Sequence, residues 1–186
     1  MTVKGIIKLV CEFVGERELL QKLGTQNSVY TTRETEKLET LLKCFNLVNQ
    51  EIASDYLPFL FEEEIDVKNS ILNFGSLSKT VVAIYQVKDR FGFAVKFKNF
   101  PNHIEIYGHG KKIVYSYLPE ELGLADTVEA NNGLSERVYA YGVASEFLLV
   151  DGMSDDAEIW EERYKESLFM LSKRHGEHRL PRRRWF

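Results

Sequence analysis

The sequence predicts an α+β protein, in which amphipathic helices from both ends of the chain pack as a bundle around an inserted antiparallel β-meander. Three observations favour this fold class. Apolar residues recur at helical spacing in the first third of the 186-residue chain, the pattern changes to a period of two between residues 64 and 117, and helical spacing returns after residue 135. The predicted division is a helical domain from residues 1–62 and 118–176, a β subdomain from 63–117, and a C-terminal tail from 177–186.

The first predicted helix lies within residues 3–23. Its apolar stripe comprises Ile6, Ile7, Leu9, Val10, Phe13 and Val14. We expect Gly15 to separate this helix from a second, shorter one, because glycine is common just beyond a helix C-terminus.

A long amphipathic helix is predicted over residues 31–57. Thr31 and Glu34 have the spacing of a capping box, in which each side chain satisfies a backbone amide of the other residue. Pro58 marks the end of the pattern, since proline cannot continue a helix. The apolar stripe between these signals comprises Leu38, Leu41, Leu42, Phe45, Val48, Ile52 and Tyr56.

Short strands are predicted in the middle third of the chain. The stretches KTVVAIYQV and FGFAVKFKNF are rich in β-branched and aromatic residues, and KDRFG between them is typical of a hairpin turn. Two further strands are expected on either side of GHGK, in HIEIYGHGKKIVYSYLP. The acidic run Glu62–Glu64 is expected to lie in a solvated loop.

Two helices are predicted to close the fold. The first, in SERVYAYGVASEFLLVDG, places Val138, Tyr141, Ala144, Ser145 and Leu148 on one face. The second begins near Ser154, with Asp155 and Asp156 where the helix dipole favours negative charge. Its buried stripe is predicted to comprise Ala157, Trp160, Tyr164, Leu168 and Leu171.

The sequence contains no recognisable catalytic motif, so we predict that the protein is not an enzyme and binds no metal or cofactor. Cys11 and Cys44 fall in helical apolar patterns and are expected to be buried thiols. His103 and His109 have no carboxylate or cysteine at a metal-ligand or acid–base spacing. An enzyme of an unrecognised type is the alternative, and it predicts a pocket with converging polar groups.

Charge is distributed unevenly along the chain. Residues 173–186 carry a net charge of +5, whereas the whole chain has a net charge of −4, so the rest of the molecule is strongly acidic. The basic stretch closes with the sequence RRRWF. Arginine and tryptophan are enriched at interface hot spots, and exposed aromatics favour burial against a partner. We therefore expect Arg182, Arg183, Arg184, Trp185 and Phe186 to dock onto another protein.

Three other interpretations of the tail are open from the sequence. It could be a frayed terminus, or it could bind nucleic acid through arginine–phosphate contacts and base stacking. The acidic body would repel a duplex, so only the tail could touch it. Membrane anchoring is disfavoured, because the tail offers little apolar area.

The sequence resembles the small head–tail connector, or neck adaptor, proteins of tailed bacteriophages. The resemblance covers about four-fifths of the chain, from residue 36 onward. It rests on the long helix LETLLKCFNLVNQEIASDYLPF, the strands ending in VYSYLPEE, the closing unit SERVYAYGVASEFLLVDGMSDDAEIWEERYKESLFML, and RRRWF. The N-terminal stretch GIIKLVCEFVGERELLQKLG is longer than the shortest members need.

The resemblance implies a structural virion protein that forms a ring, commonly of twelve copies, between the portal protein and the tail. It implies that the helices form the ring wall around the path of DNA, and that the C-terminal residues 182–186 dock on the portal. The turns near residues 89–92 and 108–110 would face neighbouring subunits or the next neck or tail protein. The implied location is the head–tail interface of the virion, with assembly in the host cytoplasm and no membrane contact.

Overall fold

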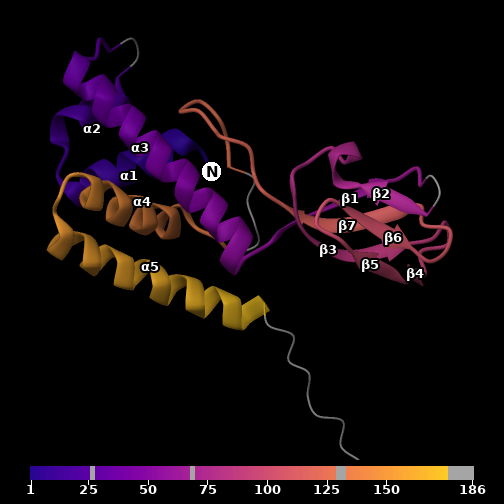
Figure 1. The fold of residues 1–186 in the computed structure, drawn as a ribbon. Helices are drawn as coiled ribbons and strands as arrows, with labels where there is room; N and C mark the ends of the chain where they lie inside the picture. The colour runs from indigo at the N-terminus through magenta and orange to yellow at the C-terminus, as the bar shows by residue number, and fades with distance from the viewer. Residues whose placement is uncertain (26–27, 68–69, 129–132, 176–186) are drawn as a thin grey trace, which may run out of the picture.

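The chain folds into helices and antiparallel sheets, which confirms the predicted α+β class. The computed structural model describes residues 1–25, 28–67, 70–128 and 133–175, with side chains as far as residue 171. The helices gather on one side of the molecule and the strands on the other (Figure 1). Among the described helices, none has both the length and the apolar character that crossing a membrane requires.

Helix α1 (Val3–Val14) begins and ends at capping residues. The Thr2 hydroxyl accepts a hydrogen bond from the Gly5 amide at 3.1 Å, and Gly15 takes a left-handed conformation with a φ of 78°. Helix α2 (Arg17–Gly24) follows directly. The predicted break at Gly15 is confirmed, and glycine suits it because it adopts positive φ at no steric cost.

Helix α3 (Thr32–Glu51) carries the predicted capping box. The Glu34 amide donates to the Thr31 hydroxyl at 3.4 Å, and the Thr31 amide donates to the Glu34 carboxylate at 2.7 Å. These bonds satisfy amides that a helix N-terminus otherwise leaves unpaired. A π-helical turn, η1 (Ile52–Tyr56), extends the helix almost to Pro58, where the helical pattern was predicted to end.

Helix α4 (Glu136–Val150) is the central helix of the structure. It packs against α1, α3 and α5, so it is buried on most of its circumference rather than on the single predicted face. In addition to most of the predicted stripe, the fold buries Tyr139, Ala140, Gly142, Val143 and Phe147. A helix surrounded by three others needs apolar residues all round, which weakens the one-sided pattern.

Helix α5 (Ser154–His175) lies against α4 with the predicted stripe inward. Ala157, Tyr164, Leu168 and Leu171 are buried, and Trp160 is half-buried. This burial confirms the predicted stripe. Residues spaced three and four apart lie on the same side of a helix, so they face α4 together.

In the part of the chain that the structure describes, seven strands form two antiparallel sheets. One sheet has the order β1-β7-β3-β4 and the other has the order β2-β6-β5. A 3-10 turn, η2 (Phe74–Ser76), follows β2. The strands are β1 (Phe59–Glu64), β2 (Ile71–Asn73), β3 (Val81–Lys88), β4 (Ala94–Val95), β5 (Phe97–Asn99), β6 (His103–Ile106) and β7 (Lys112–Tyr117).

The strand order differs from the predicted meander, in which neighbours in sequence would pair. The hairpins β3–β4 and β5–β6 follow that expectation, but β6 and β7 belong to different sheets. Strand β7 instead lies between β1 and β3. Its Ile113, Tyr115 and Tyr117 are buried, and both of its edges are paired, so the strand with the most buried residues has an internal position in its sheet.

The acidic run Glu62–Glu64 lies in strand β1, which corrects the prediction of a solvated loop. Glu62 accepts from Lys88 at 2.5 Å and from Lys112 at 3.3 Å, and these hydrogen bonds hold its pKa below the usual range. Glu63 accepts from the Tyr115 hydroxyl at 2.9 Å. Cross-strand partners therefore bind two of these carboxylates.

The two cysteines are buried and free, as predicted. Burial in the helical core raises the pKa of Cys11 to about 12 and that of Cys44 to about 11. The thiolate is disfavoured because an apolar environment penalises its charge.

Candidate functional site

The predicted docking residues 182–186 lie outside the residues that the structure describes. The structure does describe the helix that precedes them. The Tyr164 hydroxyl of α5 donates to the Glu51 carboxylate at 3.1 Å, and the Tyr164 ring meets the Tyr56 ring of η1 edge-on at 6.4 Å. The C-terminal half of α5 is therefore fixed beside the end of α3, and the helix ends on the side that faces the sheets (Figure 1).

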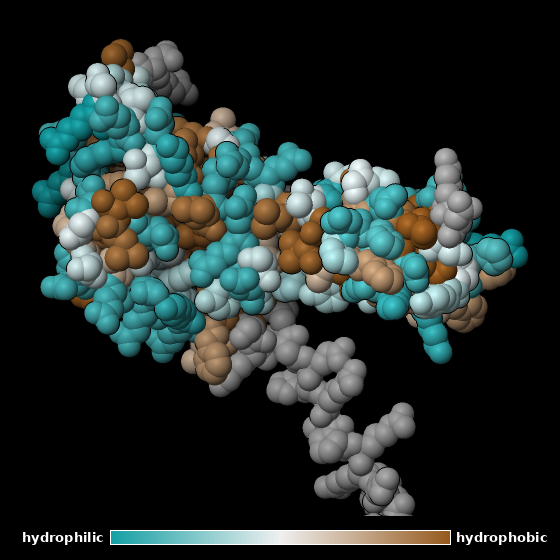
Figure 2. Space-filling model, viewed as in Figure 1, coloured by the Kyte–Doolittle hydropathy of each residue, from teal (hydrophilic) through white to brown (hydrophobic). Residues whose placement is uncertain are grey.

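The outer face of α5 forms a surface that we call the α5 strip. It comprises Glu158, Ile159, Glu162, Glu166 and Phe169, all of them exposed. The three glutamates recur every four residues, so they share one side of the helix. Figure 2 shows hydrophilic residues along the lower edge of the helical part, where α5 lies, with hydrophobic residues beside them.

A shallow groove follows this face of α5. Lys165 in the groove forms an ion pair with Glu161, so this cation is already matched. Within the described part of the chain, Glu158, Glu162 and Glu166 have no ion-pair partner. Among the described side chains, the strip therefore presents negative charge without an ion-pair partner, beside two exposed apolar side chains.

The far ends of the sheets carry exposed aromatic residues. The register pairs Lys112 of β7 with Lys88 of β3, at the end of the strands opposite the helices. The turn that follows Lys88 exposes 68% of Phe91 and 71% of Phe93, and the turn after β6 exposes 61% of Tyr107. We call these two turns, residues 89–93 and 107–111, the distal turns.

Hydrogen bonds hold the first distal turn in shape. The Asp89 carboxylate accepts from the amides of Phe91 and Phe93 at 2.8 and 2.9 Å, and Gly92 has a φ of 87°. This is the hairpin predicted from KDRFG. The Arg90 guanidinium lies over the Phe91 ring at 4.5 Å, so a cation and an aromatic ring occur together at the tip.

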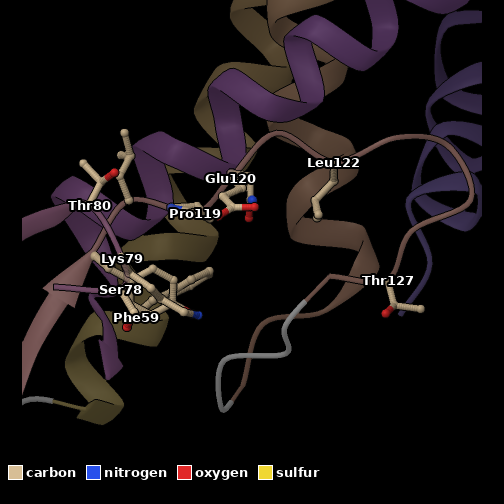
Figure 3. A pocket seen from close by; sticks show the side chains of 11 residues that line it. Phe59, Ser78, Lys79, Thr80, Pro119, Glu120, Leu122 and Thr127 are labelled. Atoms are coloured by element: carbon tan, nitrogen blue, oxygen red, sulfur yellow. The ribbon is translucent and has the colours of Figure 1, made fainter. Parts of the chain in front are cut away.

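A pocket of about 350 Å³ lies where the helices meet the sheets (Figure 3). Asn49 of α3 lines it together with Phe59, Lys79, Tyr117 and Glu120. The Lys79 ammonium lies 3.8 Å from the centroid of the Tyr117 ring. Among the described residues, the pocket lining contains no histidine or cysteine. The hydroxyl of Ser78 in the lining donates to the Glu63 carboxylate at 2.5 Å.

The histidines considered in the sequence do not converge. His103 lies in β6 with its ring stacked on Phe100 at 4.7 Å between centroids, and His109 is exposed in the second distal turn. Among the described residues, no group of three histidine, cysteine or acidic side chains is placed to hold a metal ion.

Comparisons with protein-family models and with curated proteins found no match. The functional interpretation therefore depends on the charges, exposed residues and geometry of this chain alone. The apolar pattern of α5 indicates its buried stripe and does not indicate the α5 strip. Marking the residues opposite that stripe would have found the four-residue spacing of the glutamates.

Proposed function

We propose that this protein is a phage head–tail connector, or neck adaptor, which forms a ring between the portal protein and the tail. In this proposal the helices from both ends of the chain act as a bundle that forms the ring wall. The inserted strands extend from that wall, and residues 182–186 dock on the portal. The copies form a homo-oligomer, for which twelve is the expected number, at the head–tail interface of the virion.

The separation of charge along the chain carries the proposal. Residues 173–186 have a net charge of +5, whereas the complete chain has a net charge of −4. An acidic wall allows DNA to pass without adhering, because its charges repel the phosphates. A short basic and aromatic segment has the composition of an interface hot spot. The exposed glutamates of α5 support the first part of this argument.

The distal turns support a contact with a further protein. Three aromatic residues with 61–71% exposure are concentrated in two short turns. Aromatic side chains supply large contact areas, and clusters of exposed apolar residues commonly mark interaction sites. In the proposed ring these turns contact a neighbouring subunit or the next neck or tail component.

The proposal is tested by mixing the purified protein with portal rings of the same phage. The full chain and a chain ending at residue 176 are compared by co-sedimentation, and a full chain with Trp185→Ala and Phe186→Ala separates aromatic from basic contacts. We expect the full chain to bind and both variants to lose most binding. Equal binding by all three proteins would show that the tail does not dock.

A nucleic-acid-binding function is the second candidate, favoured by the arginines at 182–184. It predicts that binding to DNA falls steeply with salt and survives replacement of both aromatics, since each phosphate contact releases counterions. Portal binding instead requires the aromatics. Another neck or tail-completion protein is the remaining alternative, and a binding partner other than the portal in phage-infected cells would identify it.

A further inference from the structure

Residues 176–186 and the α5 strip are complementary in charge and in apolar character. The groove along α5 contains four glutamates and one lysine, whereas residues 176–186 contain four arginines and one glutamate. Each surface also carries apolar residues, which are Ile159 and Phe169 in the groove and Trp185 and Phe186 in the tail. We propose that the tail docks on the α5 strip of its own chain in the free protein. This contact is independent of which partner the tail later binds.

Positive charge placed on the α5 strip would reduce the repulsion between its glutamates. Glu158, Glu162 and Glu166 are separated by four residues, and like charges at this spacing destabilise a helix. Lys165 does not relieve them, because it pairs with Glu161. Arginines laid along the same face relieve this repulsion and form charge-assisted hydrogen bonds with carboxylates.

The tail has the reach to cover the strip. Measured back from His175 at about 1.5 Å per residue, Glu166 lies at about 14 Å and Glu158 at about 26 Å along the helix. An extended tail that returns antiparallel to α5 advances about 3.3 Å per residue, which places Arg179 at about 13 Å and Arg182 at about 23 Å. The arginines therefore fall over the glutamates.

The position of the aromatic end of the tail along α5 depends on how many residues the reversal uses. Trp185 falls about 33 Å back along α5, level with Met153, which is 44% exposed. A reversal that uses two residues moves Trp185 to about 26 Å, level with Ile159, which is 53% exposed. The second register brings Trp185 level with an apolar residue of the α5 strip, whereas Met153 precedes α5 and lies outside the strip.

The occupant of the strip is the tail of the same chain rather than that of a second copy. The tail is tethered at the end of α5, and a short tether gives an effective concentration of about 1 mM or above. Gly176 suits a reversal of direction, and Pro181 favours an extended Leu180. An intramolecular contact also covers Trp185 and Phe186 without any assembly.

Backbone ¹⁵N relaxation of the full-length protein tests this contact directly. At about 0.01 M salt we expect the amides of residues 182–186 to have order parameters near 0.85, the range of a rigid backbone. At about 1 M salt, where the Debye length is about 3 Å, they should fall below about 0.6. Values below about 0.6 already at low salt would overturn the proposal.

Charge reversal identifies the docking site. The variant Glu162→Lys with Glu166→Lys should release the tail at low salt, and the control Glu36→Lys with Glu39→Lys, which makes the same change in net charge at exposed sites of α3, should not. Equal release in both variants would overturn docking on α5. Relaxation that changes on tenfold dilution would assign the contact to a second copy and overturn the intramolecular form.

Discussion

Replacing Gly142 with alanine is predicted to destabilise the fold, although this change ordinarily strengthens a helix. Gly142 lies in the middle of α4, where α3 and α5 approach it from two sides. A Cβ atom at this position would lie 2.9 Å from Val48 Cγ1 and 2.9 Å from Tyr164 Cε2. Both separations are shorter than ordinary van der Waals contact, so at least one neighbour has to move.

The expected magnitude follows from two opposing effects. Alanine is favoured over glycine in a helix interior by about 1 kcal/mol. Overpacking a core costs about 1–3 kcal/mol. The cost belongs in the upper part of that range, because Val48 is branched and 1% exposed, and Tyr164 is 4% exposed and held by its hydrogen bond to Glu51. We therefore expect a net loss of about 1 kcal/mol, which corresponds to a fall in Tm of about 2–4 °C.

Urea unfolding at constant temperature measures this effect. Gly24→Ala is the matched control, because a Cβ atom there has nothing within 4 Å and its backbone is not in the left-handed region. The control should be as stable as the wild type or slightly more stable. A Gly142→Ala protein at or above wild-type stability would refute the close approach of three helices at this glycine.

Two further predictions concern ionisation. Hydrogen bonds from Lys22 and Thr31 lower the pKa of Glu34 to about 2. The carboxylate therefore stabilises the fold above its unfolded pKa of 4.5, and this contribution is lost as the pH falls from 4.5 towards 2. When urea unfolding is measured between these pH values, the free energy of unfolding of Glu34→Gln should fall less than that of the wild type. Burial raises the pKa of Cys11 to about 12 and that of Cys44 to about 11. At pH 8 both thiols should therefore resist a thiol reagent in the native protein and react with it in denaturant. Rapid labelling of the native protein would contradict their burial.

The helices were predictable because their signals are local. A capping box, a left-handed glycine and a four-residue apolar repeat each depend on a few adjacent residues, and Thr31, Gly15 and Leu168 occupy the predicted positions. Helix α4 was only partly predicted. Its burial on most sides depends on three other helices, and one-sided periodicity does not reveal such surroundings.

The pairing of the strands was not predictable from local pattern. Strand β1 contains Glu62, Glu63 and Glu64 in succession, which reads as a solvated loop. Lys88 and Tyr115, the partners that bind the first two of these carboxylates, come from β3 and β7. Their positions become apparent only when non-local strands pair, and strand propensity depends strongly on such neighbours.

Some parts of the candidate site were predictable from the sequence and others were not. The sequence indicated the tail through its composition, and the turn at Asp89 through its hairpin signal. It did not indicate the α5 strip, since an acidic helix face resembles any solvated surface until the opposite face is known to be buried. The structure supplies that knowledge through Tyr164 and Leu168, which fix the rotation of α5.

The two proposed uses of the tail limit how tightly it can bind α5. A partner that needs the free tail binds with an affinity reduced by the fraction of molecules in which the tail is free. If the tail is docked in about nine molecules of ten, partner affinity falls about tenfold, or about 1.4 kcal/mol. A few exposed arginine–glutamate pairs, each contributing about 0.2–1 kcal/mol, give a contact of this strength. Such a contact covers Trp185 in the free protein, and a partner that buries the indole completely can still displace it.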